Sequence, residues 1–300
     1  MLKITFKILK AANSNRRSEL LMIYIVTAFH AEAKALIKHF GLKKLYEPSK
    51  FQIFSGNDIL LIESKEGIVK SSIATTFALT KFGAGEKDIA LNIGICGAVE
   101  NAFSKGDVIL CNKIINHYSK RTFYPDILIQ HSMKEATLES FMHPVKKDSL
   151  PLEIEGDIVD MEGAGFFEAA SIFLPLHNVH CIKIVYDFLD FEKIDPTEVE
   201  NLIKQSIPHI ENLINALLKL NLKFCNSTSE IDNIPLLVYK LKNSLHLTTY
   251  MTNELESLLK DYVIRHKKLP DTIFEFFEVQ INSKKEVKNY FDKLRKILLS

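Results

Sequence analysis

The chain has 300 residues, of which 47% are hydrophobic, enough to bury the core of one large domain or of a large domain with a smaller one. Its 38 basic and 37 acidic side chains leave a formal net charge of +1, which gives no reason to expect nucleic acid or a membrane as the main partner. No stretch approaches the roughly 18 consecutive apolar residues that a membrane-spanning helix needs. We therefore expect a cytoplasmic, globular protein that binds a small molecule.

The first predicted elements follow a segment without a compact pattern. Residues 1–21 carry basic side chains among apolar ones, and we expect an extension rather than a targeting segment. The apolar run over residues 22–26 predicts a strand. Apolar side chains then recur at helical spacing as far as Phe40, and Gly41 ends that helix.

The next segments alternate between strand and helix patterns. Residues 51–54 and 59–62 flank a turn sequence of Ser, Gly, Asn and Asp, which predicts an antiparallel hairpin. A helix is predicted over residues 69–82, with buried strands over residues 89–95 and 108–115. This alternation predicts a mostly parallel, twisted sheet that helices cover on both faces.

The second half of the chain contains a polar segment, then further helix and strand patterns, and then amphipathic helices alone. Residues 116–152 are polar and interrupted by prolines, so loops with short elements are predicted there. A helix over residues 162–173, a strand over 179–186 and a long helix over 196–220 follow. Residues 226–229 (Asn-Ser-Thr-Ser) are predicted to be a linker, after which only amphipathic helices are expected.

We therefore predict three segments. These are an N-terminal extension over residues 1–21, an α/β domain over residues 22–225 and a helical domain over residues 226–300. The ten histidines and four cysteines show no metal-ligand spacing, so no metal or cofactor is predicted. The cysteines are expected to be reduced.

Three carboxylates follow the ends of separate predicted elements. Glu32 comes after the first strand, Glu162 heads a helix, and Asp187 ends the strand over residues 179–186. The carboxyl ends of parallel strands meet at one edge of a sheet, so we expect the three side chains to converge. For Glu32 and Glu162 a helix dipole alone also favours an acid. Asp187 follows apolar residues, and burial there should raise its pKa.

The end of the strand over residues 89–95 offers a second candidate segment. Gly94 and Gly97 would let a ligand approach the backbone, although tight turns and close packing explain such glycines at least as often. Cys96 is expected to be a buried thiol, because no His and Asp accompany it at a recognisable spacing. His30 and His117 lie near predicted strand ends and are candidates for substrate contact.

Taken in order, five motifs resemble the nucleoside phosphorylase/nucleosidase superfamily, most closely its methylthioadenosine/S-adenosylhomocysteine nucleosidase branch. They lie at residues 28–32, 92–98, 106–107, 159–165 and 183–187. The resemblance covers about residues 22–222. It implies a three-layer α/β/α domain around a twisted mixed sheet, a purine nucleoside as substrate, no cofactor, and assembly as a homodimer or larger homo-oligomer.

The resemblance implies a role for each of the three carboxylates. Asp187 corresponds to the general acid that protonates purine N7, and Glu32 to the carboxylate that orients and deprotonates the attacking water. Glu162 corresponds to the ribose-binding residue, whose hydrogen bonds to the 2′ and 3′ hydroxyls strengthen in the transition state. Met161 would pack against the sugar.

Other positions match less closely. Gly94, Cys96 and Gly97 correspond to the loop that approaches the ribose or base, and Phe141, Phe123 and Met142 are candidates for stacking on the purine. Gly163 and Gly165 stand where the family usually has alanines.

Three functions stay open. Hydrolysis of the N-glycosidic bond is expected first, because the arginine-bearing glycine loop by which phosphorylases of this superfamily bind phosphate is absent, and Glu32 would repel phosphate. Arg121 and Lys183 keep phosphorolysis as an alternative. A nucleoside-binding module without catalysis is the third possibility, because a protein can keep a fold after it has lost the catalytic activity.

Overall fold

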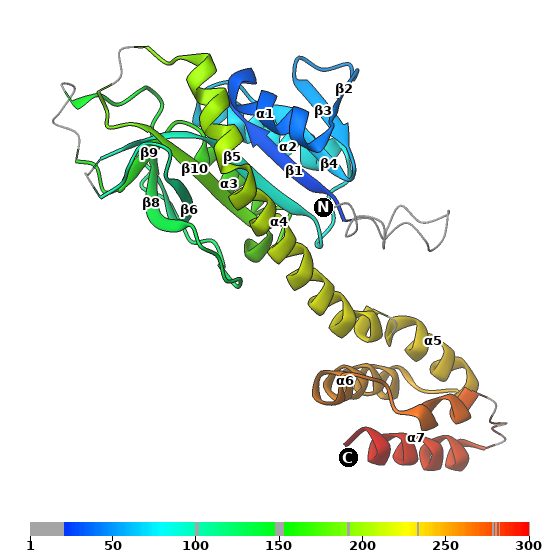
Figure 1. Ribbon diagram of the computed structural model, residues 1–300. Coiled ribbons are helices and arrows are strands. Elements are labelled where there is room, and N and C mark those ends of the chain that lie inside the picture. Colours follow the sequence, from blue (N-terminus) through cyan, green and yellow to red (C-terminus); the bar gives the residue numbers. More distant parts are fainter. Residues whose placement is uncertain are drawn as a thin grey trace. The chain divides into compact units, whose positions relative to one another are not determined.

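A computed structural model describes residues 21–99, 102–147, 153–190, 193–232, 234–277, 279, 281 and 283–299 (Figure 1). The chain divides into two compact units, Met1–Leu217 and Leu218–Ser300. This division precedes the boundary predicted at residue 225. The predicted extension over residues 1–21 lies outside the described residues, apart from Leu21.

The first unit contains most of the strands and helices predicted from sequence. In chain order its elements are β1 (Ile23–Thr27), α1 (His30–Phe40), β2 (Lys43–Leu45), β3 (Gln52–Gly56), β4 (Ile59–Glu63), α2 (Ile68–Lys81), β5 (Ile89–Ala98), β6 (Val108–Asn116), β7 (Thr122–Phe123), β8 (Lys134–Ser140), β9 (Ile158–Asp160), α3 (Gly163–Ala170), the 3-10 helix η3 (Leu176–Asn178), β10 (Val179–Asp187) and the first part of α4 (Pro196–Asp232). The predicted strand–helix alternation up to β6 is confirmed, as are α3, β10 and α4.

The strands form one mixed sheet in the order β10-β6-β8-β9-β5-β1-β4-β3-β2. β5 pairs with β1 and β10 in parallel and with β9 in antiparallel, so β10, β6, β8, β9 and β5 close a ring. The sheet is mixed, as the resemblance implied, and less parallel than the alternation alone predicted. Helix α1 packs on β1, β4 and β5, and α2 and α3 pack on each other and on the sheet (Figure 1). The predicted α/β class is confirmed.

The segment predicted to form loops, residues 116–152, contains the seven-residue strand β8. The prediction of loops with short elements did not single out this strand, because Ala136 and Leu138 are the only apolar residues among its seven. Glu139 and Ser140 are nevertheless buried, and their side chains hydrogen-bond within the protein.

The second unit is entirely helical in its described part. It contains the last part of α4, then α5 (Ile234–Leu245), α6 (Thr249–His266), the 3-10 helix η4 (Asp271–Phe277) and α7 (Lys284–Leu299). Buried side chains such as Leu241, Leu259 and Leu294 give it a core of its own. The predicted helical character is confirmed, but the linker predicted at residues 226–229 is wrong, because the helical backbone of α4 continues through it. Polar residues disfavour a helix only weakly.

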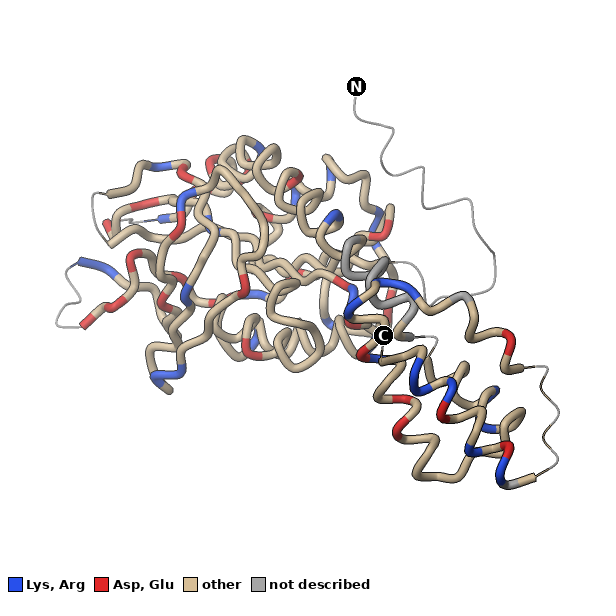
Figure 2. The backbone as a smooth tube through the Cα atoms, turned by 90° about the horizontal axis from the view of Figure 1, so that it is seen from below, with Lys and Arg blue, Asp and Glu red and all other residues tan. Residues whose placement is uncertain are grey.

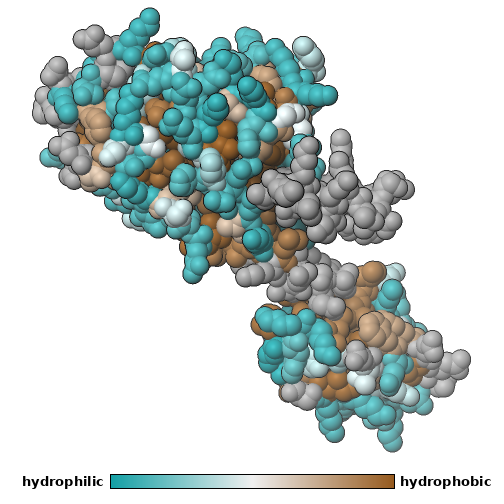
Figure 3. Space-filling view, viewed as in Figure 1, coloured by the Kyte–Doolittle hydropathy of each residue, from teal (hydrophilic) through white to brown (hydrophobic). Residues whose placement is uncertain are grey.

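The surface agrees with the balanced composition. Basic and acidic residues are scattered over both units (Figure 2), and on the face shown in Figure 3 polar residues alternate with small apolar areas. None of the described helices combines the length and apolar character that crossing a bilayer requires.

The close approach of α3 to α2 gives the first prediction. A Cβ atom at Gly165 would lie 2.0 Å from the Ile68 carbonyl oxygen, so no side chain fits without moving backbone. Gly165→Ala should lower the free energy of unfolding by more than about 2 kcal/mol, measured by thermal or denaturant unfolding. Gly85→Ala is the control, since a Cβ there meets no atom within 4 Å. Equal effects of the two substitutions would contradict this packing argument.

Candidate active site

The predicted site residues gather around residues 94–97 of β5. In the strand register Gly94 lies beside Lys183 of β10, and Gly97 lies beside both Asp187 and Val159. The central strand therefore carries β10 on one flank and β9 on another at the same level. Side chains that are far apart in sequence can meet here.

Glu32 is tied to this strand through its carboxylate. It lies in the first turn of α1 and is 2% exposed. Its Oε2 accepts hydrogen bonds from the amides of Ala28 (2.8 Å) and Phe29 (3.1 Å), and its Oε1 accepts one from Ile95 (2.9 Å). A Cβ atom at Gly94 would lie 2.6 Å from Glu32 Oε1. Gly94 thus makes room for the carboxylate of Glu32.

A buried ion pair lies beside Glu32. Lys183 Nζ is 2.6 Å from Asp160 Oδ2, and both side chains are 1% exposed. Asp160 Oδ2 also accepts a hydrogen bond from the Gly163 amide (2.8 Å), while its Oδ1 accepts one from Ser140 Oγ (2.6 Å). Removing one member of such a pair leaves an uncompensated buried charge, so the two residues act as a unit.

Glu162 occupies the N-cap position of α3 and faces α2. Its Oε1 accepts a hydrogen bond from the Gly67 amide (2.8 Å) at the start of that helix. Burial and the charges of Asp160 and Glu32 raise the pKa of Glu162 to about 8, against the opposing effect of Lys183. Glu162 therefore lies within electrostatic reach of Glu32.

The charge of Lys183 affects the pKa of the neighbouring carboxyl groups. Burial raises the pKa of Glu32, and the Lys183 charge and the three amide donors oppose that rise. Burial by itself lowers the pKa of Lys183, but Asp160 and Glu162 outweigh it and the pKa is raised. Lys183 thus stays positively charged among the carboxylates.

Asp187 stands at the other end of the gathered strand segment. It is the last residue of β10, is half-buried, and its Oδ1 accepts a hydrogen bond from the Leu189 amide (2.8 Å). Burial raises the pKa of Asp187, which confirms the expectation for this residue. A Cβ atom at Gly97 would lie 3.1 Å from Asp187 Oδ1, so this glycine also makes room for a carboxylate.

Cys96 lies between the two groups of acids. Burial raises the pKa of its thiol. The Lys183 charge opposes this rise, and the charges of Asp160 and Asp187 add to it. This confirms the predicted buried thiol and argues against a nucleophile. Of the described residues, no three His, Cys, Asp or Glu side chains cluster in a way that could hold a metal ion.

Phe141 is the stacking candidate that the structure brings next to Asp187. It is 2% exposed and packs with Val159 and Leu189, whose amide binds Asp187. Of the other two candidates, Phe123 contacts Phe167 of α3, and Met142 is exposed. Met161 is partly exposed and lies between Asp160 and Glu162 in the chain.

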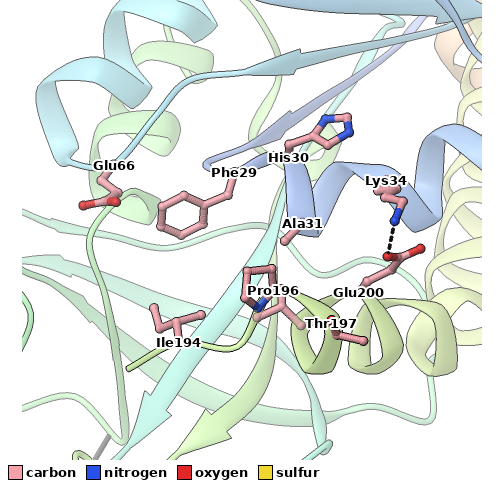
Figure 4. Close-up of a pocket in the computed structure, with 10 residues that line it drawn as sticks. Phe29, His30, Ala31, Lys34, Glu66, Ile194, Pro196, Thr197 and Glu200 are labelled. Carbon is pink, nitrogen blue, oxygen red and sulfur yellow. Dashed lines mark hydrogen bonds and ion pairs between the residues drawn. The ribbon is translucent and has the colours of Figure 1, made fainter. Parts of the chain in front are cut away.

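A cavity of about 530 Å³ adjoins the site (Figure 4). It is lined by Phe29, His30, Ala31, Lys34, Glu66, Ile194, Pro196, Thr197, Val199 and Glu200. None of the three carboxylates lines it, but the Phe29 amide binds Glu32, and Glu66 precedes the Gly67 amide that binds Glu162. His30, a predicted contact residue, lies in this cavity, and its Nδ1 is 2.7 Å from Glu63 Oε1.

Sequence reasoning missed the electrostatic centre of the site. Asp160 was not among the predicted site residues, and Lys183 was considered only as a cation that could contact phosphate; the structure pairs the two side chains in the core. A lysine inside the apolar strand Val179–Asp187 was the available signal, because an interior lysine needs an acidic partner.

The raised pKa of Glu162 predicts a pH-dependent stability. Between its ordinary pKa near 4.5 and the folded value of about 8, the folded protein holds a proton that the unfolded chain has released. The contribution to stability is complete below pH 4.5 and is lost as the pH rises through 8. Glu162→Gln cannot ionise, so its Tm relative to wild type should increase by at least about 4 °C between pH 5 and pH 9.

Differential scanning fluorimetry at both pH values measures this difference. The matched control is Glu86→Gln, at an exposed position of the same unit. A Tm difference for Glu162→Gln that does not change with pH would show that the carboxyl titrates normally.

Comparisons with known proteins agree with this geometry. Residues 22–136 match the model of the phosphorylase superfamily. The chain is 31% identical over 64 residues to the 5′-methylthioadenosine/S-adenosylhomocysteine nucleosidase of Marinomonas sp., which covers 21% of this chain and 26% of that protein. It is 26% identical over 101 residues to the nucleosidase of the same name from Baumannia cicadellinicola, over 32% of this chain and 43% of that one. The matches thus span less than half of these curated relatives.

Solved structures resemble the chain over a longer stretch. The 5′-methylthioadenosine/S-adenosylhomocysteine nucleosidase of Helicobacter pylori gives a TM-score of 0.57 at 18% identity, covering 66% of this chain and 99% of that one. The 5′-methylthioadenosine nucleosidase of Arabidopsis thaliana gives 0.56 at 18% identity, over 66% and 96%. The futalosine hydrolase of H. pylori gives 0.53 at 20% identity, over 65% and 98%. Residues 22–136 thus match the phosphorylase superfamily model, and the α/β unit shares the fold of these solved structures.

Proposed function

We propose that the α/β unit hydrolyses the N-glycosidic bond of a purine nucleoside of the methylthioadenosine or S-adenosylhomocysteine class. The observation that carries the proposal is that Glu32 and Asp187 lie against Gly94 and Gly97 of β5, with Glu162 in electrostatic contact with Glu32, in surroundings that raise the pKa of each. Relatives named as nucleosidases support the reaction class. The reaction consumes one nucleoside and one water, and we propose no cofactor.

Asp187 acts as the general acid in this scheme. Burial raises the pKa of Asp187, which is the direction that a general acid needs, and its half-buried position keeps the carboxyl within reach of a ligand. The proton passes to purine N7, the bond between ribose C1′ and N9 breaks, and its electron pair leaves with the base. Phe141, which shares its packing cluster with Leu189, supports the base.

Glu162 binds the ribose. Its Oε1 is occupied by the Gly67 amide, which leaves Oε2 to accept hydrogen bonds from the sugar hydroxyls. Those donors favour the ionised carboxylate, so substrate binding should lower the pKa of Glu162 from about 8. The same bonds stabilise positive charge on the sugar as the base departs. Met161 packs against the sugar.

Glu32 activates the water. Three amide donors and the Lys183 charge favour its ionised form against the effect of burial. The carboxylate takes one proton from water as the oxygen attacks C1′. This scheme requires Glu32 to be ionised and Asp187 to be protonated when the reaction begins.

The structure favours water over phosphate as the nucleophile. Lys183 is buried and bound to Asp160, and Arg121 is exposed and bound to Glu168. The two cations that kept phosphorolysis open are therefore each paired with an acid, and the Glu32 carboxylate would repel an incoming phosphate.

The cavity of Figure 4 suits the substituent at ribose 5′. It adjoins Glu32 and Glu162 through the Phe29 and Gly67 amides and has the volume for a thioether chain. The expected homodimer stays a proposal, for which exposed Val69 and Ile73 offer an apolar face on α2.

Base release from methylthioadenosine, followed by chromatography with and without phosphate, tests the function. We expect wild-type protein to release adenine at the same rate in both conditions. Asp187→Asn should lower kcat at least about 100-fold, since the base must leave without a proton, while nucleoside binding persists.

Two outcomes would contradict the proposal. A strict requirement for phosphate would identify a phosphorylase. Tight nucleoside binding by wild-type protein without any base release would identify a binding module. An unchanged kcat in Asp187→Asn would remove Asp187 from its role.

A further inference from the structure

The basic side chains that line the cavity of Figure 4 are each paired with an acid. Lys34 Nζ lies 2.7 Å from Glu200 Oε2, and both residues line the cavity. His30 Nδ1 lies 2.7 Å from Glu63 Oε1. Among the described residues that line this cavity, a negatively charged ligand therefore meets no unpaired cation.

Glu66 lines the same cavity, and its carboxylate has no ion-pair or hydrogen-bond partner among the described residues. The side chain is exposed, so the carboxylate can be reached by a ligand. Glu66 directly precedes Gly67, whose amide donates to Glu162 Oε1 (2.8 Å). Neighbouring Cα atoms are about 3.8 Å apart. The carboxylate of Glu66 is therefore carried by the backbone that holds the proposed ribose-binding residue.

Apolar side chains adjoin Glu66 in the cavity. In the view of Figure 4, Phe29 lies between Glu66 and Pro196, and Ile194 also belongs to the lining. Such a surface favours the methylene groups of an aliphatic chain. A carboxylate without a partner favours a cation at the end of that chain. The lining thus suits a substituent that is apolar along its length and positively charged at its end.

We propose that Glu66 is a specificity-determining residue that binds an ammonium group at the end of the ribose 5′ substituent. The inference rests on the proposed function and narrows its substrate class. S-adenosylhomocysteine carries such an ammonium group, and methylthioadenosine does not. Because Glu66 is exposed, the ion pair gives a modest preference of about fivefold in affinity.

Two matched ligands test the proposal, namely 5′-deoxyadenosines that carry an aminopropylthio or a butylthio group at ribose 5′. They have equal chain lengths and differ only in the terminal ammonium or methyl group. Calorimetry measures the dissociation constant of each with the full chain carrying Asp187→Asn, in which base release is expected to be slow. The ratio of the butylthio to the aminopropylthio constant reports the ammonium interaction, because burial of the shared chain cancels.

Adding Glu66→Gln to this chain should lower the ratio about fivefold, because the amide keeps the size of the side chain and removes its charge. The loss should fall on the aminopropylthio ligand, with the butylthio constant changed less than about twofold. High salt should lower the ratio when Glu66 is present. Glu86→Gln is the matched control, at an exposed position that does not line the cavity, and it should leave the ratio unchanged.

An unchanged ratio in Glu66→Gln, or an equal loss of affinity for both ligands, would overturn the proposal. Steady-state base release by protein with Asp187 intact separates this failure from failure of the proposed function. Release of adenine from both ligands with an unchanged ratio would reject the role of Glu66 alone. A ratio that falls as expected, in a protein that releases no base, would reject the proposed hydrolysis and support the role of Glu66.

Discussion

The buried ion pair between Lys183 and Asp160 is the constraint on which the rest of the site depends. Taking a lysine and an aspartate out of water costs several kcal/mol per ion, and a contact of 2.6 Å with further hydrogen bonds to Asp160 is what offsets that cost. The pair fixes β10 against β9 and α3. The ring of strands thereby presents its polar side chains at one level of β5.

The same pair sets the charge balance of the site. One cation faces Glu32, Asp160 and Glu162, so the three acids cannot all be ionised at low cost. Burial is the largest cause of the raised pKa of Glu162, and the charges of Asp160 and Glu32 add to it while Lys183 opposes it. A site that must hold one acid protonated and another ionised needs such an imbalance, because identical surroundings would give all carboxyls the same pKa.

Sequence patterns predicted what depends on local order and missed what depends on partners. The β–α alternation located Glu32, Glu162 and Asp187 at element ends, and the structure brings Glu32 and Asp187 to β5 and Glu162 into electrostatic contact with Glu32. Strand β8 was not predicted because Glu139 and Ser140 are polar residues that are common in loops. Only the structure shows the buried groups to which they hydrogen-bond. Sequence left two explanations open for Gly94 and Gly97, close packing or the approach of a ligand, and the structure shows close packing at both: against the Glu32 carboxylate at Gly94, and against Leu189 and Asp187 at Gly97. The helix over residues 226–229 could not be predicted from its polar sequence, because the intrinsic helix propensity of single residues is only a weak guide to structure.

The protonation of Glu162 in the folded protein is the most direct test of whether the carboxylates share one buried electrostatic environment. A ¹³C-carboxyl NMR titration of the ligand-free chain, with the Glu162 resonance assigned by its absence from Glu162→Gln, measures it directly. The account predicts a midpoint near pH 8, as burial and the neighbouring acids require. A midpoint near the ordinary value of about 4.5 would mean that the carboxylates do not share one buried electrostatic environment.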